Sequence, residues 1–153
     1  MNPPELVIRA AIEMAKCSPC QKSKRGALVF RDLKVRGAGF NSPPRQFLCS
    51  GSDACRSDCS RICEHAEGMA IRTFDRSCAT TDCDLLHVKV VDGELVPSGE
   101  PSCWQCSRQI VMHGFRGIWL FHVGGWVYYE AWPFHLLTLQ GQQIQYTLRS
   151  LGA

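Results

Sequence analysis

Apolar residues recur at helical spacing at the start of the chain. The positions concerned are Leu6, Val7, Ala10, Ala11 and Met14. Two prolines stand just before them and suit a helix start, so the pattern predicts a helix over residues 4–16. Short apolar runs at 26–30 and 35–40, separated by a polar turn at 31–34, predict two strands joined as a hairpin.

Further along the chain, helix and strand patterns alternate. They predict helices at 65–74, 103–113 and 130–140, strands at 85–91 and 117–123, and a possible last strand at 143–148. Residues 41–62 are rich in Ser, Pro, Gly and Cys and predict a long loop, and such loops are usually functional or pinned by something. The order of elements predicts an α/β fold: a three-layer α/β/α sandwich with a mixed central sheet, forming one domain over residues 1–153.

Composition narrows the class of protein. Hydrophobic residues make up 45% of the chain and charged residues 20%, which is typical of a globular protein. The net charge of +3 is too small to indicate nucleic-acid binding by itself. No basic segment followed by an apolar core opens the chain, so we expect a cytoplasmic protein. The apolar region 117–137 contains His122, Glu130 and Pro133, which make it a poor membrane span.

Candidate chemistry concentrates in two motifs, H-A-E at 65–67 and P-S-C-W-Q-C at 101–106. His65, Cys103 and Cys106 could supply three protein ligands to zinc and leave a fourth position for water. Glu67 could then move protons without touching the metal. This combination is typical of zinc deaminases. The alternative is a purely structural zinc site, with Glu67 on a solvated helix face.

The local sequence explains how these residues could meet. Ser102 and Gln105 fit a capping box, which would place Cys103 and Cys106 in the first turn of a helix, on one face. Thiols ionise more easily at a helix start, because the helix dipole favours the anion. The H-A-E motif also lies at a predicted helix start. We therefore expect two helix starts to face each other around one ion, with Glu67 returning protons to the substrate ring and to departing ammonia.

Three further segments carry a family resemblance. Residues 20–29, C-Q-K-S-K-R-G-A-L-V, residues 39–45, G-F-N-S-P-P-R, and residues 63–67, C-E-H-A-E, resemble the cytidine/deoxycytidylate deaminase superfamily, and the deoxycytidylate (dCMP) deaminase branch most closely. The resemblance runs from the first helix through Phe121. Two positions depart from it. Ser102 separates the proline from the first cysteine, and Met69 replaces the usual Asn, so the H-A-E helix is also similar to that of tRNA adenosine deaminases.

The resemblance implies roles for individual residues. His65, Cys103 and Cys106 would hold the catalytic zinc, and Glu67 would be the proton shuttle. Asn41 would hydrogen-bond the substrate near its sugar, and the backbone of Ala66 would face the base. From the residues alone, Asn41 could equally be a turn former. Three cations flank the 39–45 loop and could meet a phosphate, although surface cations are more often only solvated: Lys24, Arg25 and Arg45.

The surplus cysteines suggest a second metal. By resemblance to some dCMP deaminases, a structural zinc would be held by Cys20, Cys49, Cys55 and Cys63. A closed four-thiolate site would pin the long loop. Cys59 could replace one ligand, and Cys17 could pair with Cys20. Reduced free thiols or a redox pair remain the alternatives, and no role is assigned to Cys78 and Cys83.

The predicted function is hydrolytic deamination of a cytosine nucleotide, dCMP first, to the uracil nucleotide and ammonia. One alternative is a base in DNA or RNA, stacked on Trp104, Trp126, Tyr128 or Tyr129, although residues 126–129 suit the core better. Others are a free nucleoside or nucleobase, and a zinc-stabilised binding module in which Glu67 is dispensable. We expect a small nucleotide as partner, nucleic acid less readily, no membrane, and a homo-oligomer.

Overall fold

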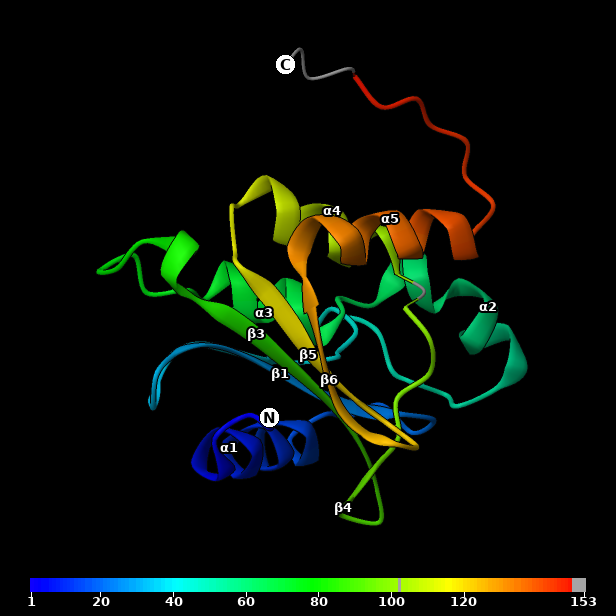
Figure 1. Cartoon of the computed structure of the whole chain (residues 1–153). Coiled ribbons are helices and arrows are strands. Elements are labelled where there is room, and N and C mark those ends of the chain that lie inside the picture. Colours follow the sequence, from blue (N-terminus) through cyan, green and yellow to red (C-terminus); the bar gives the residue numbers. More distant parts are fainter. Residues whose placement is uncertain (102, 150–153) are drawn as a thin grey trace.

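A mixed sheet forms the middle layer of the molecule (Figure 1). The computed structural model describes residues 1–101 and 103–149, with only the backbone for residues 56, 57 and 60. Within that part, the strands are β1 (Lys24–Arg31), β2 (Lys34–Phe40), β3 (Asp84–Val91), β4 (Glu94–Val96), β5 (Gly117–His122) and β6 (Gly125–Glu130). Their order is β2-β1-β3-β5-β6, with β4 beside β3. The β3–β5 pair is parallel and the other pairs are antiparallel, so the predicted mixed sheet is confirmed.

Helices cover both faces of the sheet, as predicted. α1 (Glu5–Lys16) packs on one face through Val7, Ile8, Ala11 and Ala15. The helices on the other face are α3 (Ala66–Arg72), α4 (Trp104–Met112) and α5 (Ala131–Gly141). Because side chains alternate across a strand, the odd-numbered residues of β1 and β3 face α3, and the even-numbered ones face α1. This alternation decides which side chains of the sheet reach the site described below.

α3 lies unusually close to β2 because two glycines leave room for it. A Cβ atom on Gly39 would stand 2.5 Å from the carbonyl oxygen of Ala66 and 2.6 Å from the backbone nitrogen of Ala70. A Cβ atom on Gly37 would stand 2.3 Å from the carbonyl oxygen of Ala70. The sequence G-A-G in β2 therefore fixes the depth at which α3 sits on the sheet.

The two edges of the sheet differ. At the β2 edge, Thr73 Oγ1 accepts a hydrogen bond from the N–H of Ala38 (3.1 Å) and donates to its carbonyl (2.8 Å). The N–H of Asp75 donates to the carbonyl of Arg36 (2.6 Å). Among the described residues, no comparable group binds the outward backbone of β6. The β2 edge is thus capped and the β6 edge is open.

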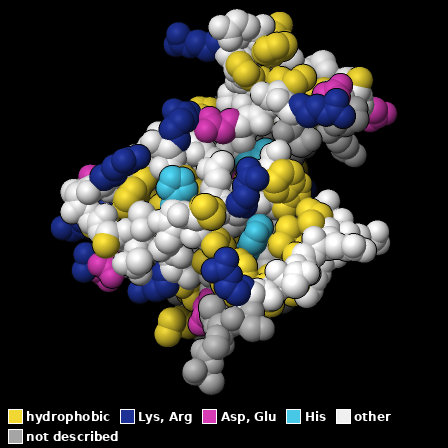
Figure 2. Space-filling view, turned by 90° about the horizontal axis from the view of Figure 1, so that it is seen from above, with side chains coloured by type: hydrophobic (Ala, Val, Ile, Leu, Met, Phe, Trp, Pro, Cys, Tyr) yellow, Lys and Arg dark blue, Asp and Glu magenta, His cyan; other side chains and the backbone are white. Residues whose placement is uncertain are grey.

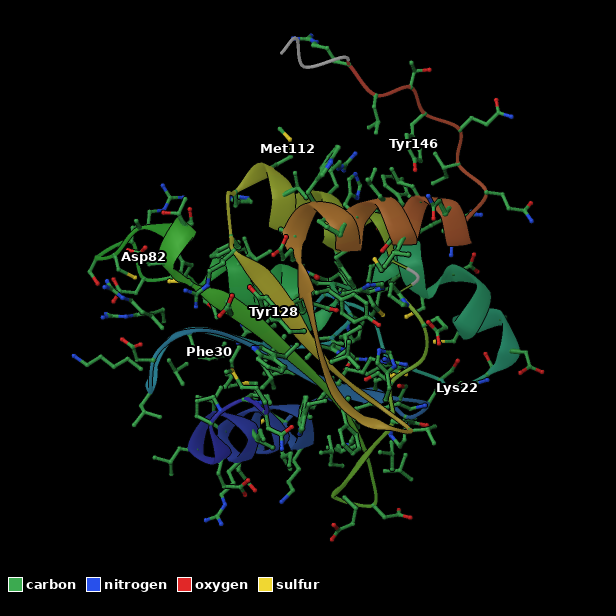
Figure 3. The ribbon with its side chains drawn as sticks, viewed as in Figure 1. Lys22, Phe30, Asp82, Met112, Tyr128 and Tyr146 are labelled. Carbon is green, nitrogen blue, oxygen red and sulfur yellow. The ribbon has the colours of Figure 1, made fainter. Side chains whose placement is uncertain are left out.

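Some predicted elements need correction. Part of the expected 41–62 loop is a helix, α2 (Asp53–Ile62), which begins where Ser52 Oγ accepts a hydrogen bond from the N–H of Cys55 (3.1 Å). β4, β6 and the short 3-10 helix η1 (Thr80–Asp82) were not predicted. Residues 144–149 form no strand; they extend away from the body, where Tyr146 is seen above α5 (Figures 1 and 3).

The start of α4 also differs from the prediction. Its N-cap is Cys103, whose Sγ accepts a hydrogen bond from the N–H of Cys106 (3.4 Å). The predicted cap, Ser102, lies outside the described residues. In the described part of this helix start, the cap is a sulfur. Among the described helices, none has the length and apolar character needed to cross a membrane.

Candidate active site

The starts of α3 and α4 face each other and bring three ligand atoms together, as expected. His65 is the N-cap of α3, and Cys103 and Cys106 lie at the start of α4. Cys106 Sγ lies 3.3 Å from His65 Nδ1 and 3.1 Å from Cys103 Sγ. All three ligand atoms fall within 4.8 Å of one another. Two sulfurs and one imidazole nitrogen at this spacing fit a tetrahedral zinc site with one position left over.

The acidities of the two sulfurs depend on each other, because the sulfurs lie in contact. The side-chain interaction with Cys106 lowers the pKa of Cys103 to about 5, since it stabilises the thiolate. The same interaction, together with burial, raises the pKa of Cys106. The hydrogen bond with Cys103 also raises the pKa of His65. A bound divalent cation would stabilise both thiolates, so the donor set suits a metal ion.

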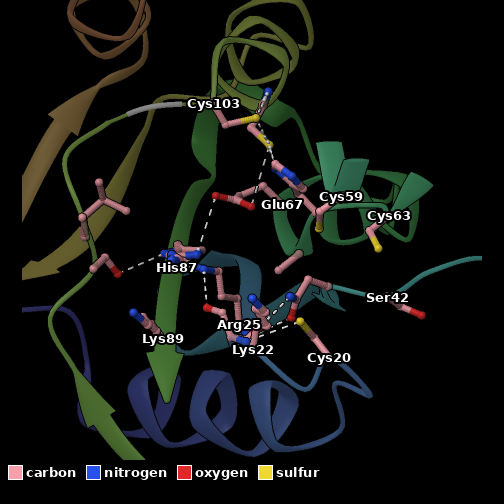
Figure 4. A pocket seen from close by; sticks show the side chains of 18 of the residues that line it. Cys20, Lys22, Arg25, Ser42, Cys59, Cys63, Glu67, His87, Lys89 and Cys103 are labelled. Carbon is pink, nitrogen blue, oxygen red and sulfur yellow. Dashed lines mark hydrogen bonds and ion pairs between the residues drawn. The ribbon is translucent and has the colours of Figure 1, made fainter. Parts of the chain in front are cut away.

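Glu67 lies beside this cluster without belonging to it. Its side chain is 14% exposed, and its Oε2 lies 3.8 Å from Cys106 Sγ. Its Oε1 lies 3.9 Å from Nε2 of His87, and Figure 4 shows the two side chains pointing toward each other. Burial raises the pKa of Glu67, but the nearby His87 and His65 outweigh it, so the pKa lies below its usual value. A carboxylate so placed can exchange protons with a molecule next to the metal ligands.

His87 is a site residue that the sequence did not reveal. It lies on β3, it is 4% exposed, and its Nδ1 lies 3.3 Å from Ser98 Oγ. Burial lowers the pKa of His87, and the neighbouring Glu67 carboxylate partly opposes this shift. The available signal was the alternation in β3, where His87 and Lys89 interrupt an apolar run at every second position. Both therefore project from the same face of the strand.

A cavity of about 470 Å³ extends from the metal ligands along the sheet. Its volume suits a small organic ligand such as a nucleotide. The polar side chains along it, beyond the ligands and Glu67, include Lys22, Arg25, Asn41, His87, Lys89 and Ser98. The reacting end therefore carries sulfur and carboxylate, and the rest of the wall carries amide and cationic groups.

Asn41 lines this cavity and also holds the chain around it. Its Oδ1 accepts hydrogen bonds from the N–H of Arg25 (2.8 Å) and from Ser18 Oγ (2.7 Å). Its Nδ2 donates to the carbonyl of Ser23 (2.7 Å). The amide thereby ties the end of β2 to the segment that leads into β1. These contacts give Asn41 a structural role, and the predicted sugar contact stays a prediction.

Of the other residues predicted to contact the substrate, some line the cavity and some do not. Ala66 is buried at the start of α3 and lines the cavity. Arg25 also lines it, whereas Lys24 is exposed and donates to the carbonyl of Ser18 (2.6 Å). Arg45 is exposed and does not line the cavity. Of the three cations expected near a phosphate, the structure brings only Arg25 to the cavity.

The remaining cysteines gather on one wall without forming a compact ligand set. The residues are Cys20, Cys49, Cys55, Cys59 and Cys63. Cys49 accepts a hydrogen bond from the N–H of Gln21 (3.3 Å) and interacts with Cys55 and Cys20, while Cys63 interacts with Cys59. Among the described residues, these thiols do not form a group close enough to hold a metal ion as they stand. The predicted four-thiolate site is therefore not closed in this structure.

The aromatic residues proposed for base stacking lie elsewhere. Trp126 packs against the core on the α1 side, and Tyr129 against the core on the other side. Tyr128 donates a hydrogen bond to Asp84 Oδ1 (2.8 Å), and Trp104 stacks with the Arg108 guanidinium at 5.0 Å. None of the four lines the cavity. Their positions agree with the core interpretation for residues 126–129.

The α/β/α fold and the His/Cys/Cys cluster beside a carboxylate define a zinc-deaminase type of site. The chain is 29% identical over 125 residues to the deoxycytidylate deaminase of Mycobacterium phage D29, covering 74% of this chain and 90% of that protein. No protein-family model matches the chain.

Solved structures show the same fold. The dCMP deaminase of cyanophage S-TIM5 in complex with dCMP and dUMP superimposes with a TM-score of 0.61 at 18% identity, covering 95% of this chain and 97% of that one. A cytidine deaminase from Burkholderia pseudomallei gives a TM-score of 0.60 at 16% identity, covering 86% and 95%. In sequence and in fold, the chain is thus similar to proteins of the cytidine/deoxycytidylate deaminase superfamily.

Proposed function

We propose that the protein is a zinc-dependent hydrolytic deaminase that converts a cytosine nucleotide, dCMP or a close relative, to the uracil nucleotide and ammonia. The observation that carries this proposal is the position of Glu67. It lies 3.8 Å from a metal-ligand sulfur, largely buried, at one end of a cavity large enough for a nucleotide.

Each residue of the site has a role in this reaction. His65, Cys103 and Cys106 would hold zinc, which supplies Lewis acidity and makes water more acidic when bound. Glu67 accepts the proton of the attacking water and delivers protons to the ring nitrogen and to the leaving ammonia. Ala66, through its backbone, and Asn41 are proposed to contact the base and the sugar. The buried position of Glu67 keeps bulk water away from these transfers.

Three observations support a free nucleotide as substrate. Lys22, Arg25 and Lys89 line the cavity and can meet an anion. Two of the similar proteins are named as deoxycytidylate or dCMP deaminases, one of them in complex with dCMP and dUMP. Figure 2, which looks down on the side of α4 and α5, shows basic side chains scattered over this face and not gathered into one stripe. A polynucleotide is usually bound along a basic stripe or groove.

Ammonia release from a substrate panel tests the proposal. The zinc-loaded protein should deaminate dCMP with a higher kcat/KM than deoxycytidine, cytosine, guanine, adenosine or a cytosine-containing oligonucleotide. Faster turnover of the oligonucleotide would instead support a deaminase that acts on a base in DNA or RNA. No ammonia from any member of the panel, with metal content verified, would support the binding-module alternative.

We also propose that the cysteine wall of the cavity takes up a second, structural zinc, with ligands among Cys20, Cys49, Cys55 and Cys63, or Cys59 in place of one. The support is the pairing of these thiols around α2 and the 39–45 loop. Binding would require the sulfurs to move closer together. Elemental analysis should give two zinc ions per chain and one in Cys49→Ser. One zinc per chain in active protein rejects the second site.

A further inference from the structure

We propose that Arg25 and Lys89 form the site that binds the 5′-phosphate monoester of the substrate; the assignment rests on the function proposed above. The two residues are direct cross-strand partners in the antiparallel pairing of β1 with β3. Both are half-buried and line the cavity, on the same face of the sheet as His87 (Figure 4). The sheet therefore presents two cations side by side to the ligand space.

This arrangement is unfavourable unless an anion joins it. Like charges directly opposite on neighbouring strands repel, because their Cβ atoms are only about 5 Å apart. A neighbouring carboxylate normally offsets such a pair. Among the described residues, neither Arg25 nor Lys89 makes an ion pair, and the Arg25 Nε donates only to Ser23 Oγ (3.0 Å). An anionic ligand bound between them would therefore reduce the repulsion between Arg25 and Lys89.

A second like-charge pair in the same sheet shows the usual solution. Arg31 and Lys34 are cross-strand partners at the hairpin end of β1 and β2. There the Arg31 guanidinium has Asp82 at 3.7 Å, and its side chain is 46% exposed, so water screens the charge. Arg25 and Lys89 are half-buried and make no ion pair among the described residues, although Glu67 and Glu100 line the same cavity and Arg25 contributes to the lowered pKa of Glu67. Compared with Arg31 and Lys34, the pair Arg25 and Lys89 is therefore the better candidate for binding an anionic ligand.

The charge and position of the pair indicate the chemical class. A phosphate monoester carries close to two negative charges at neutral pH, which matches two cations, whereas a phosphodiester carries one. Lys89 is two residues along β3 from His87, or about 7 Å, and His87 lies beside Glu67. The nucleoside can span that interval, with its base at Glu67. Lys22 also lines the cavity but is paired with Asp53 at 3.1 Å, so its charge is already offset.

Kinetic comparison of three variants tests the assignment. Lys89→Gln should lower kcat/KM for dCMP by about ten- to hundredfold, the loss expected for one charge-assisted phosphate contact. It should leave kcat/KM for deoxycytidine nearly unchanged, and Lys89→Arg should recover most of the dCMP activity. Lys34→Gln removes the same charge from the other pair and should change neither value. Equal losses on dCMP and deoxycytidine, or no loss, would overturn the phosphate assignment.

A measurement without turnover separates this inference from the proposed reaction. Inorganic phosphate at millimolar concentration should raise the melting temperature of the zinc-loaded protein and of Lys34→Gln, but not that of Lys89→Gln. Equal stabilisation of wild type and Lys89→Gln contradicts the inference. If phosphate protects as expected while the substrate panel releases no ammonia, the anion site stands and the proposed deaminase activity fails.

Discussion

At the scale of single residues, the contrast between Glu67 and Glu64 defines what the site requires of a carboxylate. Glu67 points into the cavity beside Cys106, whereas Glu64 pairs with Arg72 at 2.9 Å outside that cavity. Glu67→Gln should reduce kcat by about 10²–10⁴-fold, because an amide cannot exchange protons, while zinc content and fold persist. Glu64→Gln is the matched control and should retain activity. Near-normal turnover in Glu67→Gln would remove the proton-shuttle role.

Asp75 gives a prediction on pH. Its pKa lies below the usual value, because the Ser77 N–H and hydroxyl and the Arg36 guanidinium all stabilise the ionised form. A lowered folded-state pKa stabilises the fold above the unfolded pKa, about 3.8, and this contribution is lost as the pH falls through the folded value. Asp75→Asn should therefore be less stable than wild type at pH 7. Urea unfolding should show the gap narrowing below about pH 4, and a gap independent of pH would contradict this account.

Two short motifs in the sequence identified the three residues that the structure brings together as a candidate metal site. His65, Cys103 and Cys106 are recognisable because their spacing from helix starts is fixed by the local backbone. His87 and Lys89 were not found from the sequence, since their position at the cavity depends on which face of β3 meets it, and that face is set by packing against α3. Arg45 is near Asn41 in sequence but does not line the cavity, so its substrate contact stays a prediction.

At the scale of elements, the contact between β2 and α3 sets the position of Glu67. Gly39→Ala would place a Cβ atom 2.5 Å from the Ala66 carbonyl, so α3 would have to move outward. We expect a loss of stability of about 1–3 kcal/mol and a drop in activity, because Ala66 and Glu67 move with the helix. Gly124→Ala is the control, since a Cβ there meets nothing within 4 Å and Gly124 does not line the cavity. Denaturant unfolding and kcat/KM measure both effects, and equal stability of the two variants would refute the packing argument.

The predicted elements were correct where local pattern and tertiary packing agree. The first helix, the hairpin and the alternating segments that follow have clear apolar periodicity. α2 escaped prediction because it is short and polar and depends on the Ser52 cap. β6 was not predicted because its aromatic residues are half-buried on both faces, so the sequence lacks the alternation of apolar and polar residues that indicates a strand. Residues 143–148 do alternate, but no strand edge in the described part of the chain lies beside them.

At the scale of the whole molecule, the metal ligands join distant parts of the chain. His65 and Cys106 are 41 residues apart and meet only when the β3–β5 pair is formed. Metal binding should therefore add to folding stability, by about 2.7 kcal/mol at a free concentration 100 times Kd. Removing zinc with a chelator should lower the melting temperature, and added zinc should restore it. Cys103→Ser should lose that part of the response; an unchanged melting temperature in demetallated wild type would contradict the coupling.

The unequal edges of the sheet limit how copies of this protein can be joined. A further strand cannot hydrogen-bond to β2 where Thr73 and Asp75 already occupy its backbone groups. Two copies could meet edge to edge through β6, in a symmetric antiparallel pair. That pairing would occupy the β6 edge of each copy, so growth through β6 would end at two. A larger assembly would need the edge of β4, helix faces or loops for its additional contacts.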